Sequence, residues 1–557
     1  MNTTFSSIGK RFYFQRSIAK RSAGAALTSP AAHAPAPQEA PLRYGKLPLV
    51  QSSEYRTTAE IQIADLTRSA AGQKVVFRGR VSTVRVKGKK LAFVVVRFLN
   101  ASIQVVYFAN PEIGISAGMM DFIKRISPES IVEIEGLVSA ATKPIEGTSQ
   151  SDVEIEGRTM FVVTESLSVL PFQLSDASSR PTAAADDAAE QTSAVNQDTR
   201  LDNRWLDLRT GGSHAIFNLQ SKMQQFFRDF LNGQRGFMEI HTPKLIGTAS
   251  EGGANVFKVN YFGREAYLAQ SPQLYKQMAL QGDLGVGLFE IGPVFRAENT
   301  NTYRHLCEFM GVDLEMIIQS HYYEVLNLAE ELFFAIFDRI YAECGALVSL
   351  FTKQYAHTPL VYAVPETAMR ELGIGVIDAG ILSTDAYGAV VRNTTTRSLR
   401  LRFADAVRLL NESKSYPEHV VDTEDLSTQV EKAIGRAVKA RYGVDFYIID
   451  EYPATARPFY TMPSPRDPMW SNSYDMFLRG EEISSGAQRI HDPKMLAESA
   501  KKFGVTGVDD YISAFTLGAW PHGGFGVGLE RLVMLFLGVR NIRQASLFPR
   551  DPRRVSP

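Results

Sequence analysis

Short apolar runs alternate with polar residues between about residues 75 and 170, and turn-forming residues separate one run from the next. A period of two is typical of half-buried strands. The pattern predicts five strands, at residues 75–77, 91–96, 103–108, 131–138 and 160–163. Five short strands are the number in an OB-fold barrel, a fold that often binds nucleic acid but can also serve as a plain structural barrel.

A second pattern, with helical spacing, runs from residue 216 to residue 231. It predicts a helix with one apolar face. Residues 175–199, just before it, are rich in Ser, Ala, Asp and Pro, a composition typical of a hinge rather than of a core. The chain is therefore expected to place a barrel before a hinge and a larger C-terminal domain.

Composition limits the classes of function. The 557 residues are 45% hydrophobic and 22% charged, enough to bury a large core in two or more domains. Sixty basic residues balance sixty acidic ones, so RNA contacts must come from local patches, and no DNA partner is expected. The two cysteines, Cys307 and Cys344, make no disulfide framework or zinc cluster, so any metal should have oxygen ligands. No apolar run approaches the roughly 20 residues that span a bilayer, and no membrane partner is expected.

The first forty residues differ from the rest of the chain. Five basic residues lie among aromatic and aliphatic ones before residue 22, and the first acid is Glu39. This composition favours a mitochondrial transit peptide, and with it a mitochondrial location. The alternative is a disordered basic arm that attracts RNA phosphates in a cytoplasmic protein. Residues 31–40, rich in Ala and Pro, are typical of a linker.

One face of the predicted barrel has the chemistry of an RNA-binding surface. Phe93 follows a basic turn at residues 85–90, and Gln104 lies on the next predicted strand. Aromatic rings stack on unpaired bases, while amides read base edges. The alternative is that Phe93 belongs to the core of the barrel.

Three segments of the C-terminal part stand in a characteristic order: GFMEIHTP at residues 236–243, FRAE at 295–298 and GVGLER at 526–531. Together they resemble motifs 1, 2 and 3 of the class II aminoacyl-tRNA synthetases. The strings DTRLDNRWLDLR at 198–209 and SSGAQRIH at 484–491 narrow the resemblance to the aspartyl enzymes of eukaryotes and archaea. The glycine run is not a dinucleotide fingerprint, because the chain ends too soon after it.

This resemblance implies an α+β fold, with a five-stranded OB-fold β-barrel that binds the anticodon and a catalytic domain whose antiparallel sheet is flanked by helices. Expected boundaries are 1–43 for the basic extension with its linker, 44–172 for the barrel, 173–212 for the hinge and 213–557 for the catalytic domain. The implied reaction joins L-aspartate to tRNA(Asp) at the expense of ATP, in a homodimer with Pro243 at the interface. The anticodon contacts implied are Phe93, Gln104 and Glu154.

The motifs also imply an ATP site. Activation of a carboxylate by ATP gathers negative charge, so catalysis depends on arginine and Mg2+ rather than on a nucleophilic side chain. By resemblance, Arg296 bridges the α-phosphate and the substrate carboxylate, Glu298 binds adenine, and Arg531 holds the γ-phosphate. Arg296 and Arg531 are the implied catalytic residues, and the ATP-binding set comprises Arg296, Glu298, Arg304, His305, Leu306, Glu482, Gly528, Leu529, Glu530 and Arg531.

Residues 473–482 predict two strands joined by a turn, with Asp475 opposite Glu482. Carboxylates with phosphate oxygens and water make a site suited to Mg2+. The resemblance adds Ser485 to this metal set.

The aspartyl resemblance also implies the amino-acid site. Lys276 and Arg489 form a cationic pair for the substrate β-carboxylate, and asparaginyl enzymes lack the lysine. A buried cationic pair disfavours neutral asparagine, because unpaired buried charge is costly. The implied aspartate-binding set is Glu251, Gln273, Lys276, Arg296, Asp313, Ser485 and Arg489.

Some features depart from the resemblance. Met310 stands where relatives have a hydroxyl, residues 283–289 are unusually rich in glycine, and residues from about 352 to 421 form a divergent insertion. Alternatives at this stage are an asparaginyl-tRNA synthetase, an enzyme that charges both tRNAs, and a non-catalytic tRNA-binding protein. A non-catalytic protein of this kind should have lost Arg296, Glu482 or Arg531, but this chain has all three residues.

Overall fold

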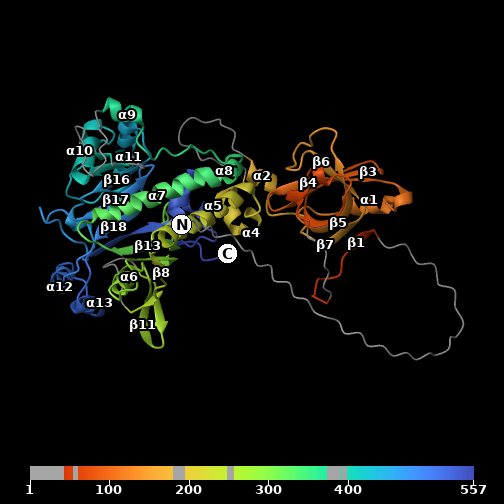
Figure 1. Cartoon of the computed structure of the whole chain (residues 1–557). Helices are drawn as coiled ribbons and strands as arrows, with labels where there is room; N and C mark the ends of the chain where they lie inside the picture. Colours follow the sequence, from red (N-terminus) through yellow and green to blue (C-terminus); the bar gives the residue numbers. More distant parts are fainter. Residues whose placement is uncertain (1–42, 54–60, 180–194, 248–255, 373–389, 392–397) are drawn as a thin grey trace, which may run out of the picture. The chain divides into compact units, whose positions relative to one another are not determined.

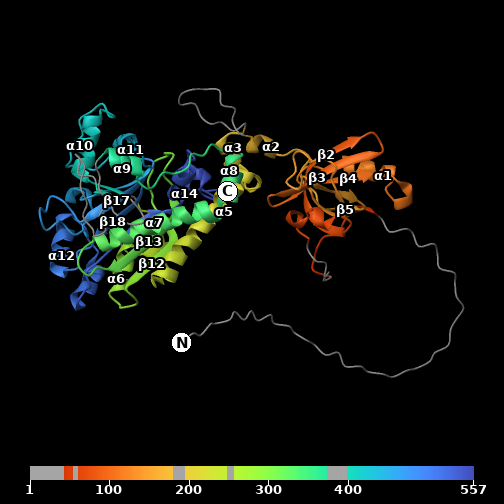
Figure 2. The same ribbon diagram turned by 45° about the horizontal axis from the view of Figure 1, so that its top comes forward.

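The computed structural model describes residues 43–53, 61–179, 195–247, 256–372, 390–391 and 398–557. Contacts divide the chain into two compact units, Met1–Ser166 and Leu167–Pro557. Figures 1 and 2 show both units from two directions. None of the described helices is both long and apolar enough to cross a membrane.

The first unit is a closed β-barrel. Its ring runs in the order β5-β2-β3-β4-β6, and β6 pairs back onto β5. Helix α1 packs beside it, and β7 extends the sheet from β5 to β1. The bounds are β1 (Tyr44–Lys46), β2 (Lys74–Lys87), β3 (Leu91–Phe98), β4 (Ala101–Phe108), α1 (Ala117–Lys124), β5 (Ile131–Ala140), β6 (Val153–Gly157) and β7 (Met160–Thr164).

The predicted five-stranded OB-fold barrel is confirmed, with one change among its strands. The fifth strand of the ring is β6, whereas the run predicted at 160–163 is β7, which lies outside the ring. Strand β6 is short and has only two large apolar residues, Val153 and Ile155, so its alternation is weak in the sequence. Gly157 ends it where a Cβ would lie 2.3 Å from the Tyr107 ring, so the close packing of β6 on β4 requires glycine.

The second unit is built on a nine-stranded sheet in the order β14-β15-β16-β17-β18-β19-β13-β12-β8. Most pairs are antiparallel, as predicted, but β8 with β12 and β15 with β16 are parallel, so the sheet is mixed. The strands are β8 (Met238–Glu239), β12 (Gly287–Phe295), β13 (Glu308–Ile317), β14 (Val390–Val391), β15 (Leu399–Arg402), β16 (Phe446–Asp450), β17 (Ser473–Leu478), β18 (Glu481–Gln488) and β19 (His522–Gly528).

Helices flank this sheet, and a small sheet, β10-β11-β9, accompanies it. The predicted helix at 216–231 is present as α5, whose end widens into a π-helix at Asp229–Gln234. The remaining elements are α2 (Leu174–Ser178), α3 (Gln197–Asp202), α4 (Arg204–Asp207), α5 (Gly211–Arg228), β9 (Leu245–Ile246), β10 (Lys258–Tyr261), β11 (Arg264–Leu268), α6 (Gln273–Leu280), α7 (Tyr323–Glu343), α8 (Gly345–Thr352), α9 (Glu366–Glu371), α10 (Phe403–Ser413), α11 (Thr428–Tyr442), α12 (Pro493–Lys502), α13 (Asp509–Ala514) and α14 (Leu529–Leu537).

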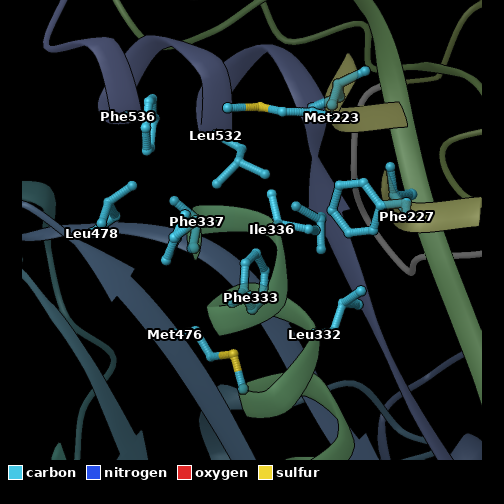
Figure 3. Packing of buried hydrophobic residues seen from close by; sticks show 14 of the residues in the cluster. Met223, Phe227, Leu332, Phe333, Ile336, Phe337, Met476, Leu478, Leu532 and Phe536 are labelled. Atoms are coloured by element: carbon cyan, nitrogen blue, oxygen red, sulfur yellow. The ribbon is translucent and has the colours of Figure 1, made fainter. Parts of the chain in front are cut away.

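The main core lies between the sheet and helices α5, α7 and α14 (Figure 3). Phe333 and Phe337 of α7 are its centre, and the Phe337 ring lies 5.9 Å from that of Phe536 on α14. Met476 of β17 and Phe227 of α5 close the cluster from the two sides. Since α14 begins directly after the glycine run, this packing fixes the strand end that carries the third motif.

Part of the expected insertion is described, and it completes one edge of the sheet. Strand β15 pairs with β16, and helices α9, α10 and α11 pack around a second core. Fully buried Phe403 and Tyr442 belong to that core. Asp425, which follows this segment, lines the cavity described next.

Candidate active site

A cavity of about 520 Å³ opens at the ends of β12, β13, β18 and β19. It gathers residues that lie far apart in the sequence. Those predicted from the sequence that line it are Gln273, Arg296, Glu298, Arg304, His305, Leu306, Asp313, Glu482, Ser485, Arg489, Gly528, Glu530 and Arg531. Lys276 and Asp475 lie behind the wall, in contact with lining residues. The Leu529 side chain belongs to the core instead, and Glu251 lies outside the described residues.

Three adjacent strands form the floor of the cavity. Asp313 of β13 and Ser485 of β18 both stand opposite Gly526 of β19. A Cβ at residue 526 would lie 3.0 Å from Asp313 Oδ1, closer than most real contacts. The glycine of the third motif therefore leaves room between the two polar side chains.

Lys276 and Arg489 are both buried, and each has an acidic partner. Lys276 Nζ donates to Asp313 Oδ1 at 3.0 Å and to the carbonyls of Leu314 and Phe525 at 3.1 and 3.2 Å. Arg489 Nε donates to Glu315 Oε1 at 3.0 Å. Thus Asp313 orients the lysine, while Glu315 orients the arginine.

Glu315 was missed in the sequence analysis. Burial raises the pKa of its carboxyl, but the charges of Arg489 and Lys276 outweigh burial and hold the pKa below its ordinary value. Two cations thus face two carboxylates in the interior. Glu315 could have been found, because it lies two residues from Asp313 on one strand, and alternate residues share a face.

The arginines of motifs 2 and 3 converge on the cavity. Arg296 follows the end of β12 and lies over the Phe309 ring, 5.7 Å from its centre. Arg531, in the first turn of α14, donates to the backbone carbonyl of Glu482 at 3.2 Å. Arg304 pairs with Glu431 of α11 at 2.9 Å, a partner that the sequence did not reveal.

Two carboxyl groups, Asp475 and Glu482, lie on neighbouring strands near the cavity, but not opposite each other as predicted. Asp475 stands opposite Ser485, and Glu482 stands opposite Phe477. The two-residue turn at Arg479 and Gly480 pairs Leu478 with Glu481 and therefore Phe477 with Glu482, since the turn sets the register of a hairpin. A bulge between Met476 and Phe477 then places Asp475 opposite Ser485.

Arg457 holds this pair of strands from one side. It donates to Asp475 Oδ2 at 2.7 Å and to Ser485 Oγ at 3.1 Å. The other carboxylate oxygen of Asp475 is buried without a hydrogen-bond partner. Burial and the negative charge of Asp475 raise the pKa of Glu482 to about 7. The raised pKa means that a second negative charge beside Asp475 is unfavourable without a cation, which a divalent metal would supply.

No group of three or more His, Cys, Asp or Glu side chains in the described part of the chain could hold a metal by itself. A cation at Asp475 and Glu482 would need further oxygen ligands, such as those of phosphates. The residues present therefore fit a metal that arrives with a nucleotide.

Glu530 lies at the rim of the cavity, almost fully buried. Its carboxylate accepts from the backbone N–H of Met310 at 3.0 Å. Burial raises the pKa of Glu530 to about 7. On the opposite loop, burial lowers the pKa of His305, whose Nδ1 lies 2.6 Å from Thr302 Oγ1.

On the barrel, Phe93 and Gln104 share the outward face. Val95, two residues from Phe93, stands opposite Gln104, and Gln104 Nε2 donates to Glu154 Oε2 at 3.0 Å. Phe93 is half-buried and lies beneath the Arg85 guanidinium, 5.1 Å from its ring centre. The alternative in which Phe93 is a core residue is wrong, because the buried core positions are its neighbours Ala92 and Val94.

Comparisons with known proteins agree with this geometry. The family described as tRNA synthetases class II (D, K and N) matches residues 196–552, and the OB-fold nucleic acid binding domain matches residues 75–162. The chain therefore belongs to the class II tRNA synthetases.

Its relatives within this class are aspartate–tRNA ligases, and the chain belongs with them. The cytoplasmic aspartate–tRNA ligase of Caenorhabditis elegans is 44% identical, over 92% of this chain and 90% of its own. That of Bos taurus is 44% identical over 92% of this chain and 95% of its own. A crystal structure described as a candidate aspartyl-tRNA synthetase from Leishmania major Friedlin is 48% identical, with a TM-score of 0.86 over 92% of this chain and 98% of that one.

The expectation of a mitochondrial location is contradicted by these relatives, which are named as cytoplasmic enzymes and match 92% of this chain. It rested on the first forty residues, which lie outside the described part. A basic composition without acidic residues does not determine the location in the cell, because the same charges also attract RNA phosphates.

Proposed function

We propose that this aspartate–tRNA ligase recognises aspartate through the buried cluster of Lys276, Arg489, Asp313 and Glu315, and activates it at the neighbouring arginines. The observation that carries the proposal is the position of this cluster at the floor of the cavity where Arg296 and Arg531 converge. Adding the substrate β-carboxylate gives the cluster a third negative charge, so the carboxylate must contact the cations directly to be bound. Gln273, whose Oε1 lies 3.4 Å from Arg489 Nη2, and Glu251 would hold the substrate backbone.

Adenylate formation requires the substrate carboxylate and the α-phosphate to meet despite their charges. Arg296 is suited to bridge them, because a guanidinium can donate to two oxygens at once. Arg531 would bind the γ-phosphate, and Arg304 and His305 would contact the nucleotide from the opposite loop. Glu298, with its Oε1 4.0 Å from Arg296 Nη1, would receive the adenine amino group. No side chain forms a covalent intermediate in this proposal.

Mg2+ is the metal that we propose for the acidic side of the cavity. Asp475, Glu482 and Ser485 would hold it together with phosphate oxygens, and support comes from the unpartnered Asp475 oxygen and the raised pKa of Glu482. When bound, it would neutralise phosphate charge. Arg457 would keep Asp475 and Ser485 aimed at the same point.

For the rest of the chain we propose the roles expected from its sequence. Residues 44–172 read the anticodon through Phe93, Gln104 and Glu154, residues 173–212 form the hinge, and residues 213–557 catalyse. A homodimer would cover the exposed Pro243 and its neighbours Met238 and Leu245, which are 45% and 47% exposed. Apolar side chains grouped in this way are typical of interfaces. Size-exclusion chromatography with light scattering should give twice the mass of 61.7 kDa.

Aspartate-dependent exchange between ATP and pyrophosphate tests the proposed site directly. We expect exchange with L-aspartate and not with L-asparagine, and near-complete loss in Arg531→Ala. The matched control is Arg540→Ala, which removes a nearby exposed arginine. Unchanged exchange in Arg531→Ala contradicts the assignment of the third motif.

A further inference from the structure

The loop between β12 and β13, residues 296–307, forms a wall between two cavities. Arg304, His305 and Leu306 line the catalytic cavity described above. Asn301, Thr302 and Tyr303 line a second cavity of about 410 Å³ on the other side. The position of this loop therefore determines where Arg304 and His305 lie. Contacts on the side of the second cavity must fix the loop in that position.

The C-terminal segment, residues 541–554, makes that contact. Backbone bonds join it to both parts of the loop: Ile542 N–H donates to the Tyr303 carbonyl at 2.8 Å, and Cys307 N–H donates to the Arg550 carbonyl at 2.7 Å. Each bond joins residues more than two hundred positions apart in the chain. The loop is thus tied at its middle and at its end.

Arg543 is the centre of this contact. Its guanidinium is only 6% exposed and donates to the Thr302 carbonyl at 2.9 Å and to Asn301 Oδ1 at 2.7 Å. Its Nε donates to Asp551 Oδ2 at 2.6 Å, so its charge is balanced from within the C-terminal segment. Its Nη1 also donates to Asn541 Oδ1 at 3.4 Å, and a planar guanidinium holds these partners in one geometry.

A contact within the loop connects Arg543 to a residue of the catalytic cavity. Thr302, whose carbonyl accepts from Arg543, has its hydroxyl 2.6 Å from His305 Nδ1. Arg543 itself does not line the catalytic cavity, although Ile542 beside it does. Any effect of Arg543 on nucleotide binding must therefore act through the loop.

The C-terminal segment is in turn anchored to the start of the catalytic unit. Arg204 of α4 donates to the carbonyls of Ser546 and Leu547 at 2.7 and 3.0 Å. Asp207 binds Arg204 Nη1 at 2.5 Å and Arg200 Nε at 2.5 Å. All three charged side chains are buried. The buried charges of this anchor are paired with each other, which offsets the cost of their burial.

We propose that Arg543 is a positioning residue for ATP: through Asn301 and Thr302 it fixes the β12–β13 loop so that Arg304 and His305 face the nucleotide. This inference rests on the proposed function of the cavity. It assigns a role in the reaction to a side chain that contacts neither substrate.

The test compares Asn301→Ala and Arg543→Gln with wild type in aspartate-dependent exchange between ATP and pyrophosphate. Asn301 is exposed, so its variant keeps the fold even if Arg543→Gln does not. We expect the KM for ATP to rise about tenfold in both, with kcat within about threefold, because the loop is displaced and not the reacting groups. Arg553→Gln is the control, since it removes an exposed arginine from the same segment and should leave both constants unchanged.

Amide hydrogen exchange of the full chain without substrate provides the second readout. We expect faster exchange at residues 301–307 in Asn301→Ala and Arg543→Gln, and no change in Arg553→Gln. The inference is overturned if Asn301→Ala has the wild-type KM for ATP and unchanged amide hydrogen exchange in the loop. It is also overturned if the only defect of Arg543→Gln is a lower unfolding temperature. If wild type shows no exchange reaction with aspartate, the proposed function fails, while the loop measurement still decides this inference.

Discussion

Arg489 and Glu315 form an ion pair in the interior of the catalytic unit, with Nε donating to Oε1 over 3.0 Å and both side chains at most 5% exposed. Lys276 Nζ lies 3.5 Å from the other oxygen of the same carboxylate. Glu315 therefore lies between the two cations to which we assign the recognition of aspartate. Its charge keeps them in place when no substrate is bound.

Replacement of Glu315 by glutamine should impair both stability and aspartate binding. The change leaves two buried cations with one carboxylate, and loss of one partner of a buried pair typically lowers the free energy of unfolding by about 3–5 kcal/mol. We expect the KM for aspartate to rise at least tenfold, and urea unfolding with exchange kinetics measures both effects.

Glu330→Gln is the matched control for Glu315→Gln. Glu330 is fully buried on α7 and binds Arg400 at 2.5 Å, outside the residues that line the cavity. The Glu330→Gln variant should be less stable than wild type, with an unchanged KM for aspartate. A similar rise in KM in both variants would mean that Glu315 acts only through the fold.

Glu482→Gln should weaken the use of Mg2+. The change removes one of two carboxylates at the acidic side of the cavity, and a hard divalent cation loses an anionic ligand. We expect kcat of the exchange reaction to fall by about 10²-fold or more and the Mg2+ concentration for half-maximal rate to rise. Binding of Mn2+ with ATP, followed by electron paramagnetic resonance, should weaken in parallel. Unaltered Mn2+ binding would contradict the metal site.

The pKa of Glu530 predicts how stability changes with pH. Burial raises this pKa from 4.5 to about 7, so the folded state binds the proton more tightly than the unfolded state does. The resulting stability is fully present below about pH 4.5 and is lost as pH rises through 7. Glu530→Gln has no such proton, so its free energy of unfolding should depend less on pH between 4.5 and 7, by up to about 1.4 kcal/mol per pH unit.

Urea unfolding at several pH values, without ATP and Mg2+, measures this difference. Glu498→Gln removes an exposed carboxylate from α12 and should follow wild type. Parallel curves for wild type and Glu530→Gln would show that Glu530 titrates as an ordinary carboxyl.

Phe93→Ala should separate tRNA binding from amino-acid activation. A stacked base contributes about 1–3 kcal/mol, so the KM for tRNA should rise about fivefold or more, while exchange between ATP and pyrophosphate stays unchanged. Phe108→Ala is the control, because Phe108 is a 56% exposed aromatic elsewhere on the same barrel. An equal rise in the KM for tRNA in both variants would mean that Phe93 has no specific role in tRNA binding.

The sequence identified those parts of the site that are contiguous in the chain. The arginines and glutamates of FRAE and GVGLER, and Lys276, all stand at the cavity or directly behind it. They were identified by resemblance to family motifs, each of which is a continuous stretch of the sequence. The five-stranded barrel followed from alternation.

What the sequence did not reveal depends on tertiary contacts. Arg457 reaches Asp475 across 18 residues, and Arg304 reaches Glu431 across 127. The turn at Arg479 and Gly480 sets the register that places Glu482 opposite Phe477 and not opposite Asp475, and alternation alone does not locate a turn to the residue. The predicted location in the cell was wrong for a related reason. Composition shows how a segment is charged, but not the compartment in which the protein is found.

Aminoacylation of total tRNA by the full chain, with ATP and Mg2+ and with labelled aspartate or labelled asparagine, tests the proposed recognition of aspartate. We expect aspartate to be attached to tRNA(Asp), asparagine not to be used, and Lys276→Met to lose this charging without gaining asparagine. Charging of tRNA(Asn) with aspartate would show relaxed anticodon reading. Efficient charging with asparagine, or none with aspartate, would contradict recognition of aspartate by Lys276 and Arg489.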